Sequence, residues 1–475
     1  MTAVLSYDDA RTQAQPTSRW LGNLPEHLGA LLLLLWWALP MTRGTGGREP
    51  HLLSIGLVIV VTAVVANRVW RWVRPRELVA AAGLVAAALV VCLASPVGWR
   101  GANELGNWAF AAGTFVVARS YLRTTARVRG VLLAVALTGM AQFATGWLAW
   151  WGGENPAQPM IGSFYWHNQF AAFLLAPAII AKALAVWPRR PGVAAGWFVA
   201  PICSAGILFS TSRATLGLLV VGWLAAGVVA LLRPGRRGSM ARLLALAALT
   251  VVTSFVLTGP PFFPHRALPS AAVAQRTQEQ SAGGNAEWRT KVWEQVPQVY
   301  AAYPVTGTGF HGFFAGTSKV THGKAQSAFA HNAWLQAFAE GGTVLGLPFL
   351  LISLLAVAAV VRRIVRAVRK RGDPQGALVG VAALVLAAHS LVDFDTSYPT
   401  LFAMLAIAFA VALAPSWQGE PDVGDGVTAR RRRPVVVAFA ASGLLCAVAL
   451  VAVVPAWHGG LHLNLPLRPV ASAGR

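Results

Sequence analysis

Residues 333–371 read AWLQAFAEGGTVLGLPFLLISLLAVAAVV followed by RRIVRAVRKR, a long and mostly apolar run that ends in a cluster of arginines. A helix from His331 to Val361 would be roughly 46 Å long at 1.5 Å per residue. The hydrocarbon core of a bilayer is only about 30 Å thick. Because the arginines from Arg362 onward would anchor one end at a membrane surface, we expect His331 to lie at or beyond the opposite surface.

The composition of the whole chain agrees with a protein dissolved in lipid. Apolar residues make up 56% of the sequence and charged residues 12%, whereas soluble domains carry about 25% charged residues. The net charge of +22 could suggest nucleic-acid binding, but the basic residues sit in short clusters between apolar runs rather than on one soluble arm. Cys92, Cys203 and Cys446 are scattered in apolar runs, which excludes a cysteine zinc site.

Further apolar runs of suitable length predict an all-α, polytopic membrane protein with about 12–13 transmembrane helices. The two runs around Ser210 and Arg213 are the least clearly separate. The expected spans are 24–41, 50–67, 77–95, 104–121, 128–150, 164–187, 193–211, 213–232, 241–258, 333–361, 376–392, 398–415 and 435–455.

The arginine clusters predict the orientation of these spans. With residues 1–23 in the cytoplasm, every cluster falls on the cytoplasmic side, as the positive-inside rule requires. The C-terminal tail 456–475 and the long connection 259–330 are then outside. The clusters comprise Arg68 to Arg76, Arg119 to Arg129, Arg189 and Arg190, Arg233 to Arg242, Arg362 to Arg371, and Arg430 to Arg433.

The connection 259–330 is the only long one between expected spans, and loops of this length are usually functional or disordered. Its segment Ala286 to Tyr303 has aromatic and aliphatic residues at helical spacing. We therefore expect an extracytoplasmic loop that is folded and docked on the membrane domain, in which His311 is a surface residue.

Three residues on the expected outer face could carry chemistry together. Arg213 precedes an apolar span, Arg289 lies in the amphipathic part of the loop, and His331 begins the long helix. Each also has a simpler interpretation. Arg213 could extend to the membrane interface, Arg289 could be a solvated surface charge, and His331 could be an ordinary interfacial histidine. As a set, two guanidinium forks suit a diphosphate, and a neutral imidazole can accept a hydroxyl proton near pH 7.

The segment from His331-Asn332 through Gly341-Gly342 to Gly346 resembles a signature shared by O-antigen ligases, O-antigen polymerases and bacterial O-oligosaccharyltransferases. The similarity covers roughly residues 160–400. The family commonly has about twelve helices, so the span 435–455 looks like an addition. Other segments similar to the family are Arg289 to Trp293, Tyr303 to Phe310, Ser212-Arg213, Gly162 to Ala171 with Asn168, and His389 to Asp393.

The resemblance implies a membrane glycosyltransferase of GT-C-like architecture that needs no metal or other cofactor. It implies inverting transfer of glycan from an undecaprenyl-diphosphate-linked donor to an acceptor on the outer face of the cytoplasmic membrane. Arg213 and Arg289 would bind the leaving diphosphate, and His331 would be the catalytic base.

Three further residues are expected to contact substrate: Asn332, Asn168 and Asp393. Asn332 could instead cap its helix. Asp393 and Asp395 form a DxD pattern that could bind a metal ion, although the simpler interpretation is that they cap a helix or pair with an arginine.

The alternative function is a polysaccharide or lipid transporter or flippase. Transporters tend to show internal repeats and ionisable residues at mid-membrane depth. The two halves of this chain show no repeat, and almost no ionisable residue is expected at mid-depth before residue 258. The enzyme is therefore favoured. Ligases and polymerases share the donor chemistry, so the sequence leaves open whether the acceptor is a glycan, a lipid or a protein.

Overall fold

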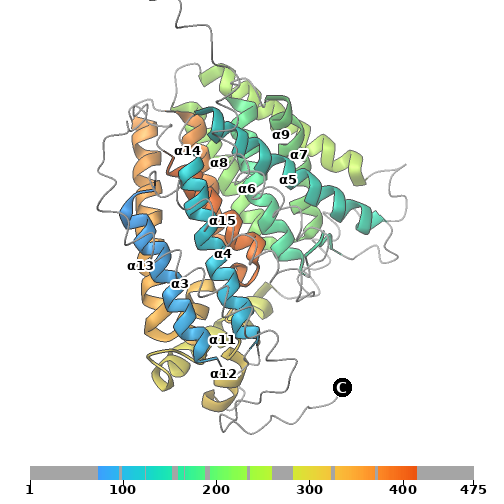
Figure 1. Cartoon of the computed structure of the whole chain (residues 1–475). Coiled ribbons are helices and arrows are strands. Elements are labelled where there is room, and N and C mark those ends of the chain that lie inside the picture. Colours follow the sequence, from blue (N-terminus) through green and yellow to red (C-terminus); the bar gives the residue numbers. More distant parts are fainter. Residues whose placement is uncertain are drawn as a thin grey trace, which may run out of the picture.

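The computed structural model describes residues 73–95, 99–122, 125–151, 159–164, 166–187, 193–232, 236–258, 282–321, 327–369 and 373–414. In this part of the chain all regular structure is helical (Figure 1). The expected spans 24–41, 50–67 and 435–455 and both terminal segments lie outside the described residues. The helices are α3 (Pro75–Leu93), α4 (Trp99–Tyr121), α5 (Thr125–Trp151), α6 (His167–Val186), α7 (Val193–Ser210), α8 (Arg213–Leu231), α9 (Arg236–Thr258), α11 (Ala282–Ala302), α12 (Phe313–Thr321), α13 (Ala333–Arg369), α14 (Pro374–His389), η3 (Asp395–Ser397) and α15 (Pro399–Ala412).

Each expected span between residues 77 and 415 coincides with a helix. The pair around Ser210 and Arg213 forms two separate helices, because Thr211 has a φ of 58° and breaks the helical path. Among the described residues, seven helices are long and apolar enough to cross a membrane, and α14 and α15 are shorter apolar helices. The protein is thus an all-α, polytopic membrane protein.

Helix α6 is the centre of the bundle. Every residue from Gln169 to Val186 is buried, and α6 packs against α5, α7, α8 and α14. By contrast, the outer faces of α8, α9 and α13 present large apolar side chains, as expected for surfaces in contact with lipid. Examples of these exposed residues are Val220, Leu224, Val228, Val251, Phe255, Leu351, Leu354 and Leu355.

Lys182 is an exception to the expected scarcity of ionisable residues before residue 258. It lies on the buried helix α6, and its Nζ is 4.4 Å from the centre of the Trp223 ring of α8. A cation over the face of a tryptophan is attracted by the ring, by about 2 kcal/mol when desolvated. The Nζ has no hydrogen-bond partner among the described residues, so the ring contact offsets only part of the cost of burying this side chain.

One end of the bundle, which we call the arginine end, is held by two buried or half-buried arginines. Arg119 pairs with Glu77 at 3.0 Å and donates to the carbonyl of Leu413. Arg363 donates to the carbonyls of Ala412 and Ala414, each at 2.7 Å. These carbonyls have no partner within α15 because they lie at its C-terminus. The arginines therefore cap α15 and complement its dipole.

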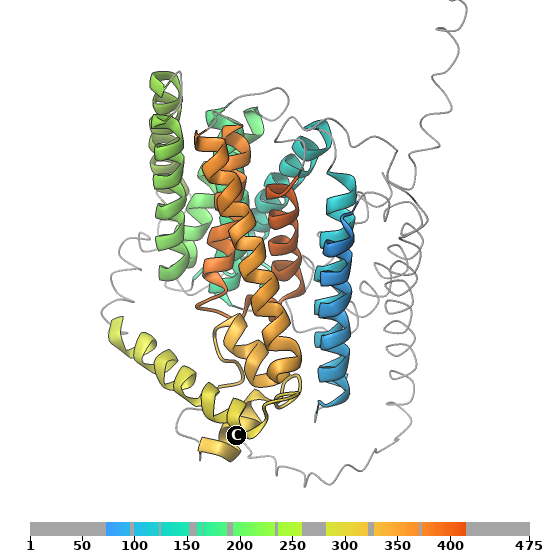
Figure 2. The same ribbon diagram turned by 90° about the vertical axis from the view of Figure 1, so that its left-hand side faces the viewer.

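The opposite end, which we call the loop end, carries α11 and α12 beyond the long helices (Figure 2). The expected amphipathic helix is present as α11. Its residues Val292, Val296 and Val299 are buried in a small core with Phe313 of α12 and Ala339 of α13. The described part of the connection 259–330 is therefore folded and docked on α13.

The expectation of one continuous long helix after the connection is wrong. Gly342 has φ 55° and ψ −150°, which breaks α13 near its start, and the second part continues past Val361 to Arg369. The segment before α12 fills the break: Thr308 and Gly309 donate to the carbonyls of Ala339 and Glu340.

The break also has a steric cause. A Cβ on Gly342 would lie 2.4 Å from the carbonyl oxygen of Val305, and one on Gly307 would lie 2.3 Å from the carbonyl carbon of Glu340. Glycines at both positions allow the two backbones to touch. Gly307 and Gly342 thus allow the loop to pack directly against the backbone of α13.

Candidate active site

His331 lies at the loop end, between the rings of Trp288 of α11 and Phe394. The ring centroids are 5.2 and 4.9 Å away, and both contacts are edge-to-face. His331 has a φ of 50°, a left-handed conformation in which histidine is enriched relative to most other residues. The imidazole is 20% exposed, so it is oriented by its neighbours and still reachable by a substrate.

The start of α13 fixes the backbone beside this histidine. The side-chain oxygen of Asn332 accepts from the N–H groups of Trp334 and Leu335, both at 3.0 Å, which is the N-cap arrangement. The N–H of Ala333 donates to the carbonyl of Ser390 at 2.8 Å. Asn332 thus orients the helix start, and its side-chain oxygen is occupied by the cap.

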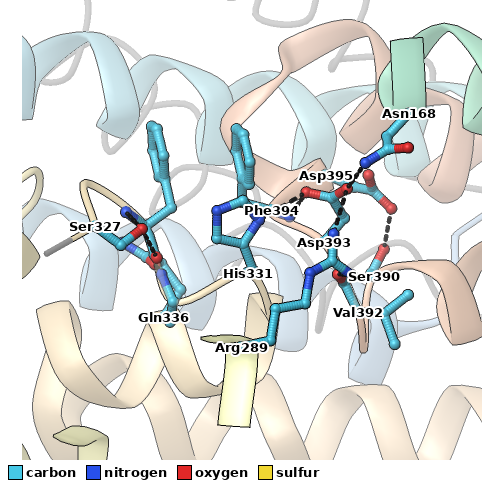
Figure 3. Close-up of polar contacts among 12 residues, drawn as sticks. Asn168, Arg289, Ser327, His331, Gln336, Ser390, Val392, Asp393, Phe394 and Asp395 are labelled. Carbon is cyan, nitrogen blue, oxygen red and sulfur yellow. Dashed lines mark hydrogen bonds and ion pairs between the residues drawn. The ribbon is translucent and has the colours of Figure 1, made fainter. Parts of the chain in front are cut away.

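Asp393 lies in the turn after α14 and joins several candidate residues (Figure 3). Its Oδ1 is 3.4 Å from Nδ1 of His331, which is an electrostatic contact rather than an aligned hydrogen bond. Its Oδ2 accepts from Nδ2 of Asn168 at 3.1 Å, and its Oδ1 accepts from the N–H of Phe394 at 2.9 Å. Asp393 is 2% exposed, so these groups replace water around its carboxylate.

The environment keeps Asp393 ionised. Burial acts to raise its pKa, but the interaction with His331 and the charges of His389 and Arg289 outweigh burial and hold the pKa below its usual value. Asp393 is therefore a carboxylate at neutral pH. A carboxylate beside Nδ1 favours the tautomer in which Nδ1 carries the proton and Nε2 has the free lone pair.

Arg289 approaches the same carboxylate from α11. Its Nη1 donates to the carbonyl of Val392 at 2.5 Å, and its Nη2 is 3.7 Å from Oδ2 of Asp393. The side chain is 17% exposed, and its Nε has no hydrogen-bond partner among the described residues. The guanidinium is thus fixed beside His331, and its side chain remains partly exposed.

Arg213 is the candidate that the structure does not bring into this network. It is exposed at the start of α8, and within the described part of the chain no hydrogen bond or ion pair joins it to Arg289, His331 or Asp393. Arg213 nevertheless lies at the loop end. It follows α7 closely, and the carbonyl of Phe209 near the end of α7 accepts from the N–H of Met160. Met160 precedes the start of α6, where Asn168 contacts Asp393.

Several groups at the site were not found from the sequence. Trp288 and Phe394 flank the imidazole, and Phe394 is stacked on Phe329 with centroids 4.2 Å apart. Trp288 immediately precedes Arg289, and Phe394 lies between the two aspartates, so their positions in the motifs were a usable signal. No sequence signal marked the carbonyl of Val392, because every residue has the same backbone acceptor.

Comparison with known families bears on the same region. A family model described as O-antigen ligase matches residues 198–350. The matched stretch runs from α7 into α13 and includes Arg213, Arg289 and His331. Over this stretch the chain is similar to O-antigen ligases. Among curated proteins, no relative matches it.

Asn168 and Asp393, two residues of the site, lie outside the matched stretch. Asn168 precedes it and Asp393 follows it, yet both side chains meet at the loop end. The packing of α6 and the turn after α14 against the matched helices therefore completes the site.

The DxD pattern formed by Asp393 and Asp395 does not form one ligand pair. Asp393 faces His331 and Arg289, whereas Asp395 accepts from Ser390 at 3.0 Å and contacts Nδ1 of His389 at 2.7 Å. Nor do the described residues contain a group of three or more His, Cys, Asp or Glu side chains suited to a metal ion. The geometry matches the simpler interpretation, in which one aspartate pairs with an arginine.

A second polar cluster lies near the site and corrects the expectation for His311. This residue is not a plain surface histidine: its side chain is 27% exposed, and its Nε2 is 3.8 Å from Oε2 of the buried Glu104 of α4. Glu340 of α13 is also buried and accepts from the N–H of Phe313 at 3.3 Å. This cluster could not be predicted from the sequence, because its members are far apart in the chain.

Proposed function

We propose that the protein is an integral-membrane glycosyltransferase. It transfers glycan from an undecaprenyl-diphosphate-linked donor to an acceptor hydroxyl on the outer face of the cytoplasmic membrane, with inversion and without a metal ion. The observation that carries the proposal is the group formed by His331, the Asp393 carboxylate and Arg289 at one end of a membrane bundle. The match of residues 198–350 to the O-antigen ligase family model supports glycosyl transfer of this general kind.

In the proposed reaction His331 is the general base. Asp393 faces Nδ1, so Nε2 is the nitrogen that takes the proton from the acceptor hydroxyl. The acceptor oxygen forms a bond to the anomeric carbon as the bond from that carbon to the diphosphate oxygen breaks. A single displacement of this kind inverts the configuration at the anomeric carbon.

The arginines stabilise the leaving group. Undecaprenyl diphosphate gains negative charge as the glycosidic bond breaks, and cationic donors fixed in advance stabilise that charge in the transition state. Arg289 is half-buried and held by Val392 and Asp393, which suits a fixed donor. Arg213 is exposed, which suits first contact with a lipid head group at the interface.

The partners follow from this chemistry. The donor is a lipid-linked glycan, and the acceptor is a hydroxyl on a glycan, lipid or protein. A ligase and a polymerase use the same donor chemistry and differ in the acceptor. Asn168 and Asn332 contribute to the site by orienting Asp393 and the start of α13.

The proposal is tested by transfer of a lipid-linked glycan to acceptor in vesicles that contain the purified protein. We expect product with the wild type and about 10–100-fold less with Arg289→Lys, because loss of one charge-assisted hydrogen bond costs about 1.5–3 kcal/mol. Lys291→Ala is the matched control, since Lys291 lies on the same helix and pairs with Glu287 at the surface. Movement of glycan or lipid across the membrane without any product would favour a transporter instead.

The orientation can be tested separately by cysteine labelling in cells, in a background without Cys92, Cys203 and Cys446. We expect a membrane-impermeant reagent to label Glu287→Cys on α11 in intact cells. Arg366→Cys at the arginine end should react only after permeabilisation, because arginine clusters stay in the cytoplasm. The reverse pattern would place the site inside the cell and contradict the proposal.

Metal independence predicts that transfer by the purified protein survives EDTA. The physical reason is that His331 and Arg289 already lie beside Asp393, while His389 lies beside Asp395. A divalent cation would have to displace these groups to bind both carboxylates. Loss of activity in EDTA that Mg²⁺ or Mn²⁺ restores would refute this part of the mechanism.

A further inference from the structure

The turn between α14 and α15 carries two buried carboxylates that face in different directions. Asp393 faces the proposed base, as described above. Asp395 faces the end of α14, where it contacts Nδ1 of His389 at 2.7 Å and accepts from Oγ of Ser390 at 3.0 Å. Both Asp395 and His389 are buried. The proposed function assigns no role to this second pair.

Four contacts connect the turn to the site, and Figure 3 shows Asp393 of this turn beside His331 and Arg289. The carbonyl of Ser390 accepts from the N–H of Ala333, two residues after His331. The carbonyl of Val392 accepts from Arg289. The side chain of Asp393 lies against both His331 and Arg289. The position of this short turn therefore sets the geometry of the base, its carboxylate and one arginine.

The His389–Asp395 pair closes the turn that makes these contacts. It joins the last residue of α14 to the first residue of η3, so residues 390–394 form a loop with fixed ends. Nδ2 of Asn107 on α4 donates to the carbonyl of Ser397 at 3.3 Å, which holds the segment just after the pair. The charge of His389 also acts directly on Asp393, where it contributes to the lowered pKa.

Simpler roles do not account for the pair. Asp395 does not cap α15, because the N-cap position is Tyr398, which makes no side-chain cap bond. Stabilisation of the fold is a weak explanation as well, since burying two charges costs about as much as their attraction returns. One oxygen of Asp395, Oδ1, is buried without a hydrogen-bond partner among the described residues, which adds to that cost.

We propose that His389 and Asp395 form a positioning pair for glycosyl transfer, which holds the turn 390–394 so that Asp393 meets His331 and Val392 meets Arg289. The inference rests on the proposed function. The pair does not touch substrate. It acts through Asp393 and the neighbouring carbonyls, and a displacement of about 1 Å at a reacting group can cost about 10²-fold in rate.

The test is a double-mutant cycle on the rate of transfer in vesicles. Asp395→Asn keeps the shape of the side chain and removes its charge, and we expect a loss of about 10²-fold. Asp393→Asn should cost a similar factor. Because Asp395 acts mainly through Asp393, the loss in the double variant should be close to that of Asp393→Asn and far smaller than the product of the two single losses. His389→Gln provides a second, independent way to break the pair.

Glu77→Gln is the matched control. It breaks the Arg119–Glu77 ion pair, also with little solvent exposure, but at the arginine end. We expect its effect on the rate to be small and to multiply with that of Asp393→Asn, because the two sites share no contact. The thermal unfolding of every variant is measured in detergent, so that loss of fold is separated from loss of rate.

The outcomes distinguish the alternatives. A double variant close to Asp393→Asn supports the inference. Wild-type activity in Asp395→Asn, or effects of Asp393→Asn and Asp395→Asn that simply multiply, overturns it. If neither Asp395→Asn nor His389→Gln folds, the pair is a stability element and the inference is wrong. If the wild type makes no product, the proposed function fails and this inference fails with it.

Discussion

Replacement of His331 by alanine is expected to lower the rate of glycan transfer by about 10²–10⁴-fold, the usual cost of losing a general base. No neighbour on α13 can take over, because Ala333, Trp334 and Leu335 carry no base. The variant should still insert into the membrane and still bind the lipid-linked donor, since both arginines remain. The measurement is transfer in reconstituted vesicles, together with donor binding.

The left-handed backbone of His331 calls for a second variant. Asparagine tolerates a positive φ better than most residues, so His331→Asn removes the base and leaves the backbone unstrained. We expect it to be as inactive as His331→Ala and to unfold at the same temperature as the wild type. Equal product from the wild type and either variant would remove His331 from the mechanism.

His311→Ala is the matched control for this experiment. His311 also lies at the loop end, has a φ of 57° and is exposed to a similar degree. The substitution removes an imidazole that has a similar backbone conformation and exposure to that of His331 but does not contact Asp393. We expect at most a few-fold change in rate. An equal loss in both alanine variants would indicate that the backbone conformation, rather than the base, is what transfer requires.

Gly342→Ala is expected to destabilise the protein and to reduce transfer strongly. The backbone at Gly342, with φ 55° and ψ −150°, is in a region that only glycine adopts easily, and other residues there cost about 1–3 kcal/mol. The added Cβ would also lie 2.4 Å from the carbonyl oxygen of Val305 and 2.5 Å from the nitrogen of Gly307. The segment 304–309 would have to move away, and α11 with Arg289 would lose its support.

Gly83→Ala on α3 controls for this change. A Cβ at Gly83 meets nothing within 4 Å, and alanine is favoured over glycine inside a helix by about 1 kcal/mol. Thermal unfolding in detergent should show a lower midpoint for Gly342→Ala and an unchanged or higher one for Gly83→Ala. Equal midpoints for the two variants would show that the close backbone contact does not hold the loop.

The sequence by itself determined the membrane fold, because its signals are local. Each apolar run of sufficient length must form a helix in lipid, where unpaired backbone groups are too costly, and every such run between residues 77 and 415 is a helix. The amphipathic spacing in α11 is a signal of the same kind. The trio of Arg213, Arg289 and His331 could be named in advance because ionisable groups are rare in such a chain.

Only the tertiary structure decided which of the candidate residues meet. Asn168 and Asp393 are 225 residues apart and touch because α6 and the turn after α14 reach the same end of the bundle. The carbonyl of Val392 accepts a hydrogen bond from Arg289, and a backbone acceptor cannot be identified from the sequence. The break at Gly342 exists because another segment fills it. Contacts of this kind depend on the packing of distant helices, which the periodicity of any one helix does not encode.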